Sequence, residues 1–153
     1  MCIRDRFTPD QQRSAAELCR VVRPGGRIGL ANWTPNGFIG RLFKTIGSYV
    51  PNPLPSPALW GTTEHIDTLF AAHATDIRIT TRQFNFRYPS VAAWLDNFKQ
   101  VYGPLKNAFA ALDGGQQAAM HADILALLQD LNDSEHGDMM VPGEYLEIVI
   151  DRA

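Results

Sequence analysis

The spacing of apolar positions changes several times along the chain, and each change predicts a new element. Thr8 and Gln11 form a capping box around Pro9, which predicts the start of a helix. The apolar residues of this helix recur at i, i+3, i+4 and i+7, namely Ala15, Leu18, Cys19 and Val22. Residues 23–26, Arg-Pro-Gly-Gly, end the helix and turn the chain. Residues 27–33 then carry apolar or small side chains at successive positions, which is typical of a central strand covered on both faces.

The middle of the chain predicts two helices that flank a proline-rich loop, followed by a strand. Apolar residues at helical spacing predict the first helix over 38–50, and a second is expected over 62–72. Between them, an extended loop that ends at Trp60-Gly61 is predicted by four alternating prolines, Pro51, Pro53, Pro55 and Pro57. The apolar period changes to two over 76–88, which predicts a strand. Its apolar positions change parity near residues 82–83, so a bulge or bend is expected there.

The last part of the chain predicts a helical block and one more strand. Residues 89–135 form the block, in which Gly103-Pro104 interrupts the apolar stripes. The chain then ends in a strand over 145–150 that is apolar on both faces at its centre, which favours an internal position in a sheet. The succession of helices and two-faced strands indicates an α/β fold.

Composition excludes several classes of protein. The chain has 153 residues, about the length of one domain, with 45% apolar residues, 20% charged residues and a net charge of −2. No segment approaches the roughly 18 consecutive apolar residues that a membrane span needs, and no run of Lys and Arg indicates nucleic-acid binding. We therefore expect no membrane span and no nucleic-acid partner.

Cysteine and histidine spacing argues against a secreted protein and against a metal site. Cys2 and Cys19 form no disulfide framework and no metal motif, and charges replace the apolar region of a signal peptide, so a cytoplasmic location is expected. The four histidines lie at no ligand spacing, so no metal site is expected. A histidine general base stays open.

Residues 1–6, Met-Cys-Ile-Arg-Asp-Arg, have neither helical nor strand periodicity. They resemble translated adapter sequence at the ends of reading frames from metagenomic assemblies. We therefore interpret them as non-native and expect that a natural N-terminal part was lost. The alternative is a natural disordered terminus.

Residues 20–33, Arg-Val-Val-Arg-Pro-Gly-Gly-Arg-Ile-Gly-Leu-Ala-Asn-Trp, resemble the fifth-strand motif of class I S-adenosylmethionine-dependent methyltransferases, in particular those similar to the ubiquinone and menaquinone C-methyltransferases. The likeness extends over residues 7–152. It implies an α/β fold: the C-terminal half of a Rossmann-like methyltransferase sheet, with strands five, six and seven, the last antiparallel, and a helical insertion over 89–135 between the last two strands.

The same resemblance implies that the cofactor-binding half is missing. This family binds S-adenosylmethionine through a Gly-rich loop after strand one and through residues at the ends of strands two and four. The only adjacent glycine pairs here are Gly25-Gly26 and Gly114-Gly115, and neither lies between a strand and a helix start. We therefore assign no cofactor-binding residue to this chain, although the intact protein is expected to bind S-adenosylmethionine.

The candidate binding residues lie where an acceptor molecule would enter. Ligands of open α/β sheets lie beyond the carboxyl ends of the strands, which places Asn32, Trp33 and Thr34 at the rim of a pocket. Residues 36–61, with Trp60 at their end, are interpreted as a lid or as a plain connection. An apolar acceptor pocket or an ordinary core would use the aromatic residues of the inserted helices, Trp94, Phe98 and Tyr102. Glu144 and Glu147 are interpreted as solvated charges.

The sequence therefore predicts a fragment of a small-molecule methyltransferase that supplies the acceptor side of the cleft and is inactive alone. In-line methyl transfer depends mainly on alignment and on exclusion of water, and no catalytic residue is assigned. The exposed edge of the strand over 27–33 predicts self-association. The alternative is a non-catalytic small α+β ligand-binding module.

Overall fold

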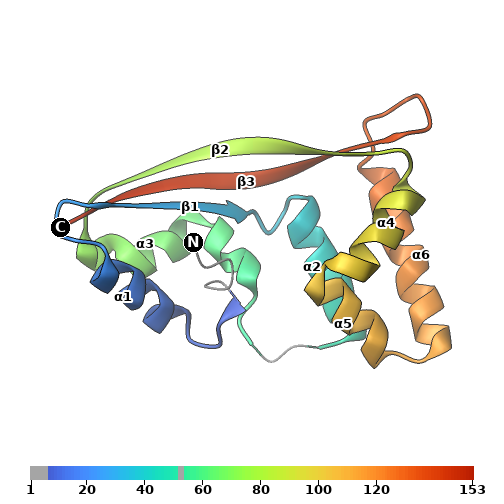
Figure 1. Cartoon of the computed structure of the whole chain (residues 1–153), viewed down its shortest axis with the longest axis horizontal. Helices are drawn as coiled ribbons and strands as arrows, with labels where there is room; N and C mark the ends of the chain where they lie inside the picture. The colour runs from blue at the N-terminus through green and yellow to red at the C-terminus, as the bar shows by residue number, and fades with distance from the viewer. Residues whose placement is uncertain (1–6, 52–53) are drawn as a thin grey trace. The chain divides into compact units, whose positions relative to one another are not determined.

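The computed structural model describes residues 7–51 and 54–153, which fall into two compact units (Figure 1). Of these residues, 7–36, 54–82 and 144–153 form the first unit, and 37–51 and 83–143 form the second unit. The interpretation of residues 1–6 as adapter sequence, and Pro53 of the proline loop, lie outside the described residues. In the part of the chain that is described, no helix is both long and apolar enough to cross a membrane.

The first unit combines three strand segments with short helices. It contains α1 (Gln11–Val21), β1 (Arg27–Trp33), the 3-10 helix η2 (Pro57–Gly61), α3 (Thr63–Phe70) and the 3-10 turn η3 (Ala71–His73). Residues 74–82 of β2 (Ala74–Tyr88) and residues 144–152 of β3 (Met139–Arg152) complete it.

The first helix begins later than its sequence pattern predicts. The N-cap is Asp10, whose carboxylate accepts a hydrogen bond from the backbone N–H of Arg13 at 2.8 Å. The Thr8 hydroxyl donates instead to the Asp10 carbonyl oxygen. The expected capping box with Thr8 at the N-cap is therefore wrong, because the carboxylate of Asp10 satisfies the helix N–H groups first.

The turn before β1 uses both of its glycines. Gly25 has a φ of +69°, in the left-handed region that glycine adopts without strain. A Cβ added to Gly26 would lie 2.7 Å from the carbonyl oxygen of Arg23. The turn is fastened to the end of β3, since the Gly25 N–H donates to the Arg152 carbonyl and the Arg152 N–H donates to the Gly26 carbonyl, at 3.1 and 2.9 Å.

The second unit is mainly helical. It contains α2 (Phe38–Tyr49), α4 (Val91–Val101), α5 (Gly103–Ala111) and α6 (Gly114–Asp130), together with the remaining parts of β2 and β3. Ser90 caps α4, and Asp113 forms a capping box with Gln116 at the start of α6. The helices α4, α5 and α6 follow one another between β2 and β3 in the chain, within the range predicted as a helical block.

The strands form a three-stranded sheet of order β1-β3-β2, with β1 antiparallel to β3 and a register that runs from Arg27 opposite Asp151 to Trp33 opposite Tyr145. The expected α/β fold, half of a Rossmann-like sheet, is therefore wrong: the described strands form a small antiparallel sheet. The pattern misled because Gly29 and Ala31, which fit the small residues of a strand covered on both faces, are exposed. Small residues suit both a covered face and an open one.

The strand β2 runs from one unit into the other. Ile77 and Ile79 are half-buried in the first unit, whereas Phe86 is buried in the second. The change in parity that the sequence shows near residues 82–83 coincides with the boundary between the units. Phe84, which has the same parity as Phe86, is nevertheless 52% exposed.

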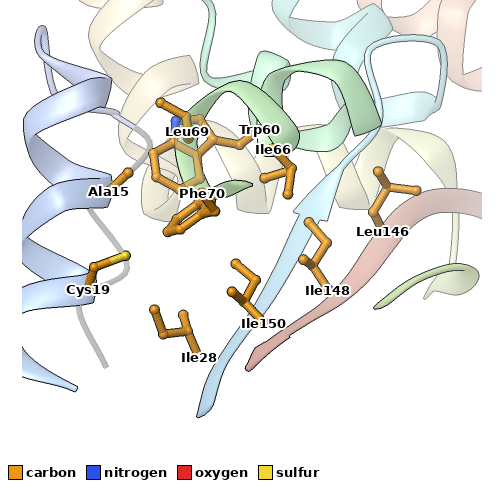
Figure 2. Close-up of a cluster of buried hydrophobic side chains, with 10 residues drawn as sticks. All are labelled: Ala15, Cys19, Ile28, Trp60, Ile66, Leu69, Phe70, Leu146, Ile148 and Ile150. Atoms are coloured by element: carbon orange, nitrogen blue, oxygen red, sulfur yellow. The ribbon is translucent and has the colours of Figure 1, made fainter. Parts of the chain in front are cut away.

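The core of the first unit packs one face of the sheet against α1, α3 and η2 (Figure 2). Leu146, Ile148 and Ile150 of β3 face Ile66 and Phe70 of α3 within this cluster. The other members are Ala15, Cys19, Ile28, Trp60 and Leu69. Each fully buried large aliphatic side chain contributes roughly 1.5–3 kcal/mol through its removal from water.

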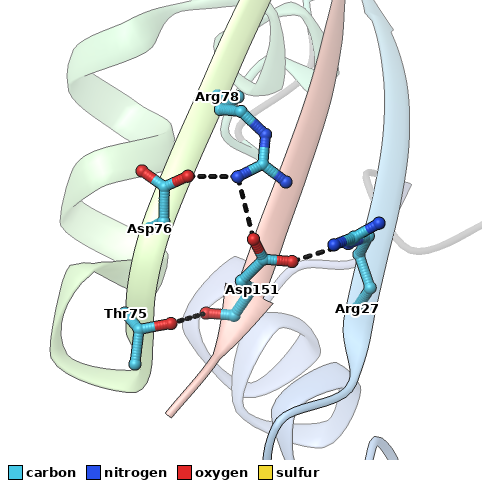
Figure 3. Close-up of polar contacts among 5 residues, drawn as sticks. All are labelled: Arg27, Thr75, Asp76, Arg78 and Asp151. Carbon is cyan, nitrogen blue, oxygen red and sulfur yellow. Dashed lines mark hydrogen bonds and ion pairs between the residues drawn. The ribbon is translucent and has the colours of Figure 1, made fainter.

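The opposite side of the strand ends carries an exposed ionic cluster (Figure 3). Asp151 accepts hydrogen bonds from Arg27 at 2.6 Å and from Arg78 at 2.8 Å, and Arg78 also pairs with Asp76. The Arg78 guanidinium, followed by that of Arg27, lowers the pKa of Asp151 below its usual value. Because these groups are exposed to solvent, they fix the register more than they add stability.

Candidate functional site

The carboxyl end of β1 carries two buried polar residues. Asn32 and Thr34 are 6% and 7% exposed, and strand alternation places both on the core side of the sheet. The backbone N–H of Thr34 donates to the carbonyl oxygen of Glu144 at 3.1 Å, which extends the pairing of β1 and β3 by one residue. The Thr34 hydroxyl donates to Oε1 of Glu144 at 2.9 Å. We call Asn32, Thr34 and Glu144 the strand-end site.

Glu144 is the member of this site that the sequence analysis did not select. It is half-buried, and among the described residues no cation lies within ion-pair distance of its carboxylate. The interpretation of Glu144 as a merely solvated charge missed the Thr34 hydroxyl, which lies 110 positions away in the chain. Glu147 does pair with a cation, Arg82, at 3.2 Å and on the exposed surface.

Trp33 lies on the other face of the sheet from the strand-end site. Its indole ring packs edge-to-face on Tyr145, with ring centroids 5.8 Å apart and an interplanar angle of 77°. Because the two residues are cross-strand partners, this aromatic pair also fixes the register at the end of β1.

The 3-10 helix η2 lies directly against the end of β1. A Cβ added to Gly61 would lie 2.0 Å from the carbonyl oxygen of Trp33 and 2.9 Å from Cα of Thr34, so only glycine fits this contact. The neighbouring Trp60 is 1% exposed and packs edge-to-face on Phe70, with ring centroids 6.0 Å apart. Its indole N–H has no hydrogen-bond partner among the described residues.

A second polar group joins α1 to α3 in the first unit. Gln11 is 5% exposed, and its Oε1 lies 2.7 Å from Nε2 of His65. The amide of Gln11 also donates weakly to the carbonyl oxygen of Ser56, at 3.4 Å. Burial lowers the pKa of His65 below its usual value, which favours the neutral ring as the donor to Gln11. Sequence spacing gave no signal for this pair.

The remaining predicted site residues lie together in the second unit. Trp94 stacks on Phe98 with ring centroids 4.0 Å apart, and Phe98 contacts Tyr102 at 5.4 Å. Phe38 of α2 packs edge-to-face on Trp94 at 5.2 Å. Trp94 is fully buried, whereas Phe98 and Tyr102 are half-buried. We call Phe38, Trp94, Phe98 and Tyr102 the aromatic cluster.

The predicted site residues thus fall into two groups. Asn32, Trp33, Thr34 and Trp60 belong to the first unit, and Trp94, Phe98 and Tyr102 belong to the second. The segment 36–61 that was interpreted as a lid is likewise divided, because α2 belongs to the second unit and η2 to the first.

The described residues do not fit S-adenosylmethionine. Gly25 and Gly26 form the turn into β1, and Gly114 and Gly115 open α6 under the Asp113 cap, so neither pair forms a loop between a strand end and a helix start. A nucleotide-type cofactor needs such a loop for its close backbone contacts. Nor do the described residues contain a group of three or more His, Cys, Asp or Glu side chains that could hold a metal ion.

The fold therefore defines an α+β chain with an antiparallel sheet, and comparison with known proteins adds relatives without an assigned activity. No family model matches the chain. It is 35% identical over 150 residues to the uncharacterized protein Rv1405c of Mycobacterium tuberculosis, a match over 95% of this chain and 54% of that protein. It is 36% identical over 130 residues to the uncharacterized protein Mb1438c of Mycobacterium bovis, over 81% of this chain and 47% of that protein. The chain spans about half the length of the curated relatives that it matches.

Proposed function

We propose that this chain is the acceptor-binding part of an S-adenosylmethionine-dependent methyltransferase that acts on a small molecule. The observation that carries the proposal is the strand-end site, in which a buried hydroxyl and a half-buried carboxylate meet beyond the end of β1. The segment over 20–33 that resembles the methyltransferase motif leads directly to this site.

The residues of this chain would bind and orient the acceptor. Methyl transfer is an in-line displacement, so its rate depends on the alignment of two ligands and on the exclusion of water. Thr34 and Glu144 supply hydrogen-bonding groups held in place by backbone pairing, and Gly61 holds η2 against the same strand end. Because the described residues do not fit the cofactor, the chain alone is expected to be inactive.

The partner is a small-molecule acceptor and not a nucleic acid, and the expected compartment is the cytoplasm. Self-association is expected through β1, which lies at the edge of the described sheet and exposes Gly29 and Ala31.

A non-catalytic ligand-binding module is the second candidate. The small antiparallel sheet, packed on a hydrophobic core of its own, supports this candidate. In this case the strand-end site and the aromatic cluster would each bind a ligand without chemistry.

A transfer assay separates the two candidates. The full-length relative Rv1405c would be incubated with methyl-tritiated S-adenosylmethionine and a small-molecule extract of its host, and the 153-residue chain would be treated in parallel. We expect tritium in small molecules with the full-length relative and none with the chain. If the proteins retain a molecule from the extract but no labelled product forms, the result would support the binding module and contradict the methyltransferase.

A further inference from the structure

Within the described part of the chain, one of the two carboxylate oxygens of Glu144 accepts a side-chain hydrogen bond. Its Oε1 accepts the only hydrogen bond that the Thr34 hydroxyl can donate, and its backbone carbonyl accepts the Thr34 N–H. An ionised carboxylate has about four acceptor positions and no donor, so Oε2 can accept from a further group. The complementary partner is a hydrogen-bond donor, either a hydroxyl or a protonated amine.

The surroundings of Glu144 favour a ligand as that partner. A half-buried carboxylate loses part of its hydration, and a charge-assisted hydrogen bond compensates for the free energy that this loss costs. None of the described Arg, Lys or His side chains forms an ion pair with Glu144, whereas Glu147, two residues further along β3, is paired with Arg82. Thr34 is 7% exposed and its hydroxyl is committed to Oε1, so the carboxylate is held in one orientation.

We propose that Glu144, oriented by Thr34, binds the hydroxyl or amino group of the acceptor molecule and excludes molecules that present a carboxylate in that position. This inference rests on the proposed function and names the class of acceptor. A carboxylate ligand would meet like charge and could donate no hydrogen bond to Oε2, whereas an alcohol donates one and an ammonium group adds opposite charge.

Three probes that share a phenyl ring and differ in their polar group test this specificity. Benzylamine, benzyl alcohol and benzoate would each be titrated into the isotope-labelled 153-residue chain while backbone amide NMR shifts are followed. We expect benzylamine and benzyl alcohol to shift the amides of Thr34, Glu144 and Tyr145 in a saturable manner, and benzoate to leave them unchanged. Equal shifts with benzoate, or no shift with any of the three probes, would overturn the proposal.

Two matched variants separate binding from structure. Glu144→Gln keeps an acceptor for Thr34 but removes the charge, so benzylamine should bind about tenfold more weakly or worse while benzyl alcohol loses less. Glu147→Gln makes the same change on the exposed surface of the same strand and should bind all probes as the wild type does. Unchanged benzylamine binding in Glu144→Gln, or the same loss in Glu147→Gln, would refute the assignment.

The outcome for the proposed function is read separately. Binding of S-adenosylhomocysteine by full-length Rv1405c reports on the methyltransferase and does not depend on the benzyl probes. If the relative does not bind S-adenosylhomocysteine while Glu144 still selects benzylamine, the proposed methyltransferase activity is refuted. The proposed site at Glu144 for a hydroxyl or amino group then stands. If it binds while Glu144 selects nothing, the acceptor class fails alone.

Discussion

Gly61 offers the sharpest test of how η2 is held against β1. A Cβ added at this position would lie 2.0 Å from the Trp33 carbonyl oxygen and 2.6 Å from the Trp33 carbonyl carbon, both backbone atoms that no rotamer change can move. Gly61→Ala must therefore displace η2 from the strand end. Overpacking of this kind costs about 1–3 kcal/mol, and the backbone contact places this case near 3 kcal/mol. At about 2–4 °C per kcal/mol for a chain of this size, the unfolding midpoint should fall by about 6–12 °C.

The measurement is thermal unfolding followed by far-ultraviolet circular dichroism and by Trp fluorescence, with Gly29→Ala as the control. Gly29 lies in β1, and an added Cβ at that position meets no atom within 4 Å. Its replacement should leave the midpoint unchanged or slightly higher, because glycine weakens strands. If Gly61→Ala unfolds at the same temperature as Gly29→Ala, the close approach of η2 to β1 is refuted.

Three further substitutions test the electrostatics and caps. Burial lowers the pKa of His65 below 6.5, so protonation of this ring favours the unfolded chain. The free energy of unfolding should therefore fall as the pH drops from about 7 to about 5. In urea unfolding, His65→Gln should reduce this pH dependence, and an unaltered dependence would contradict the prediction. The hydrogen bond from Arg78 lowers the pKa of Asp151 below 3.8. The ionised carboxylate therefore stabilises the folded chain above pH 3.8, and this stabilisation is lost as the pH falls through the pKa of Asp151 in the folded state. Acid unfolding of Asp151→Asn should lack this loss, and an acid-unfolding profile equal to that of the wild type would argue against it. Asp113→Ala removes the cap of α6 and should lower the free energy of unfolding, measured by thermal unfolding, by about 0.5–2 kcal/mol. The control Asp96→Ala, at an exposed position in the middle of a helix, should change this free energy by less than about 0.5 kcal/mol. Equal losses in the two variants would count against the cap.

Local structure was largely predictable because the signals are local. The 3.6-residue spacing of Ala15 and Cys19 placed α1, and both residues are buried. The prolines and glycines marked the ends of elements, as at Gly25, whose positive φ closes the turn into β1. The cap of α1 was misplaced because Thr8 and Asp10 are both good caps, and only the three-dimensional path of the chain selects between them.

The fold class was not predictable from the same signals. A strand with Gly29 and Ala31 on one face fits a covered parallel sheet and an open antiparallel sheet equally well, and strand pairing is decided by residues far apart in the chain. The parity change in β2 was visible in the sequence, but its meaning, a passage between two units after Arg82, was not.

The candidate site was predictable only in part. Asn32 and Thr34 were selected from their position at the carboxyl end of a strand, and both are buried. Glu144 was passed over because an isolated acid in a strand is usually solvated, and its hydrogen bond from Thr34 depends on the pairing of β1 with β3. The link between Gln11 and His65 likewise joins two helices that sequence spacing does not relate.

The most direct test of the acceptor-side assignment is a pair of thermal unfolding scans with and without saturating S-adenosylhomocysteine. One scan uses the full-length mycobacterial relative Rv1405c and the other uses the 153-residue chain. A ligand that binds only the folded state, at a concentration of 100 Kd, stabilises it by about 2.7 kcal/mol. We predict a higher midpoint for the relative and an unchanged midpoint for the chain. An unchanged midpoint for the relative, or an equal rise for the chain alone, would contradict the assignment.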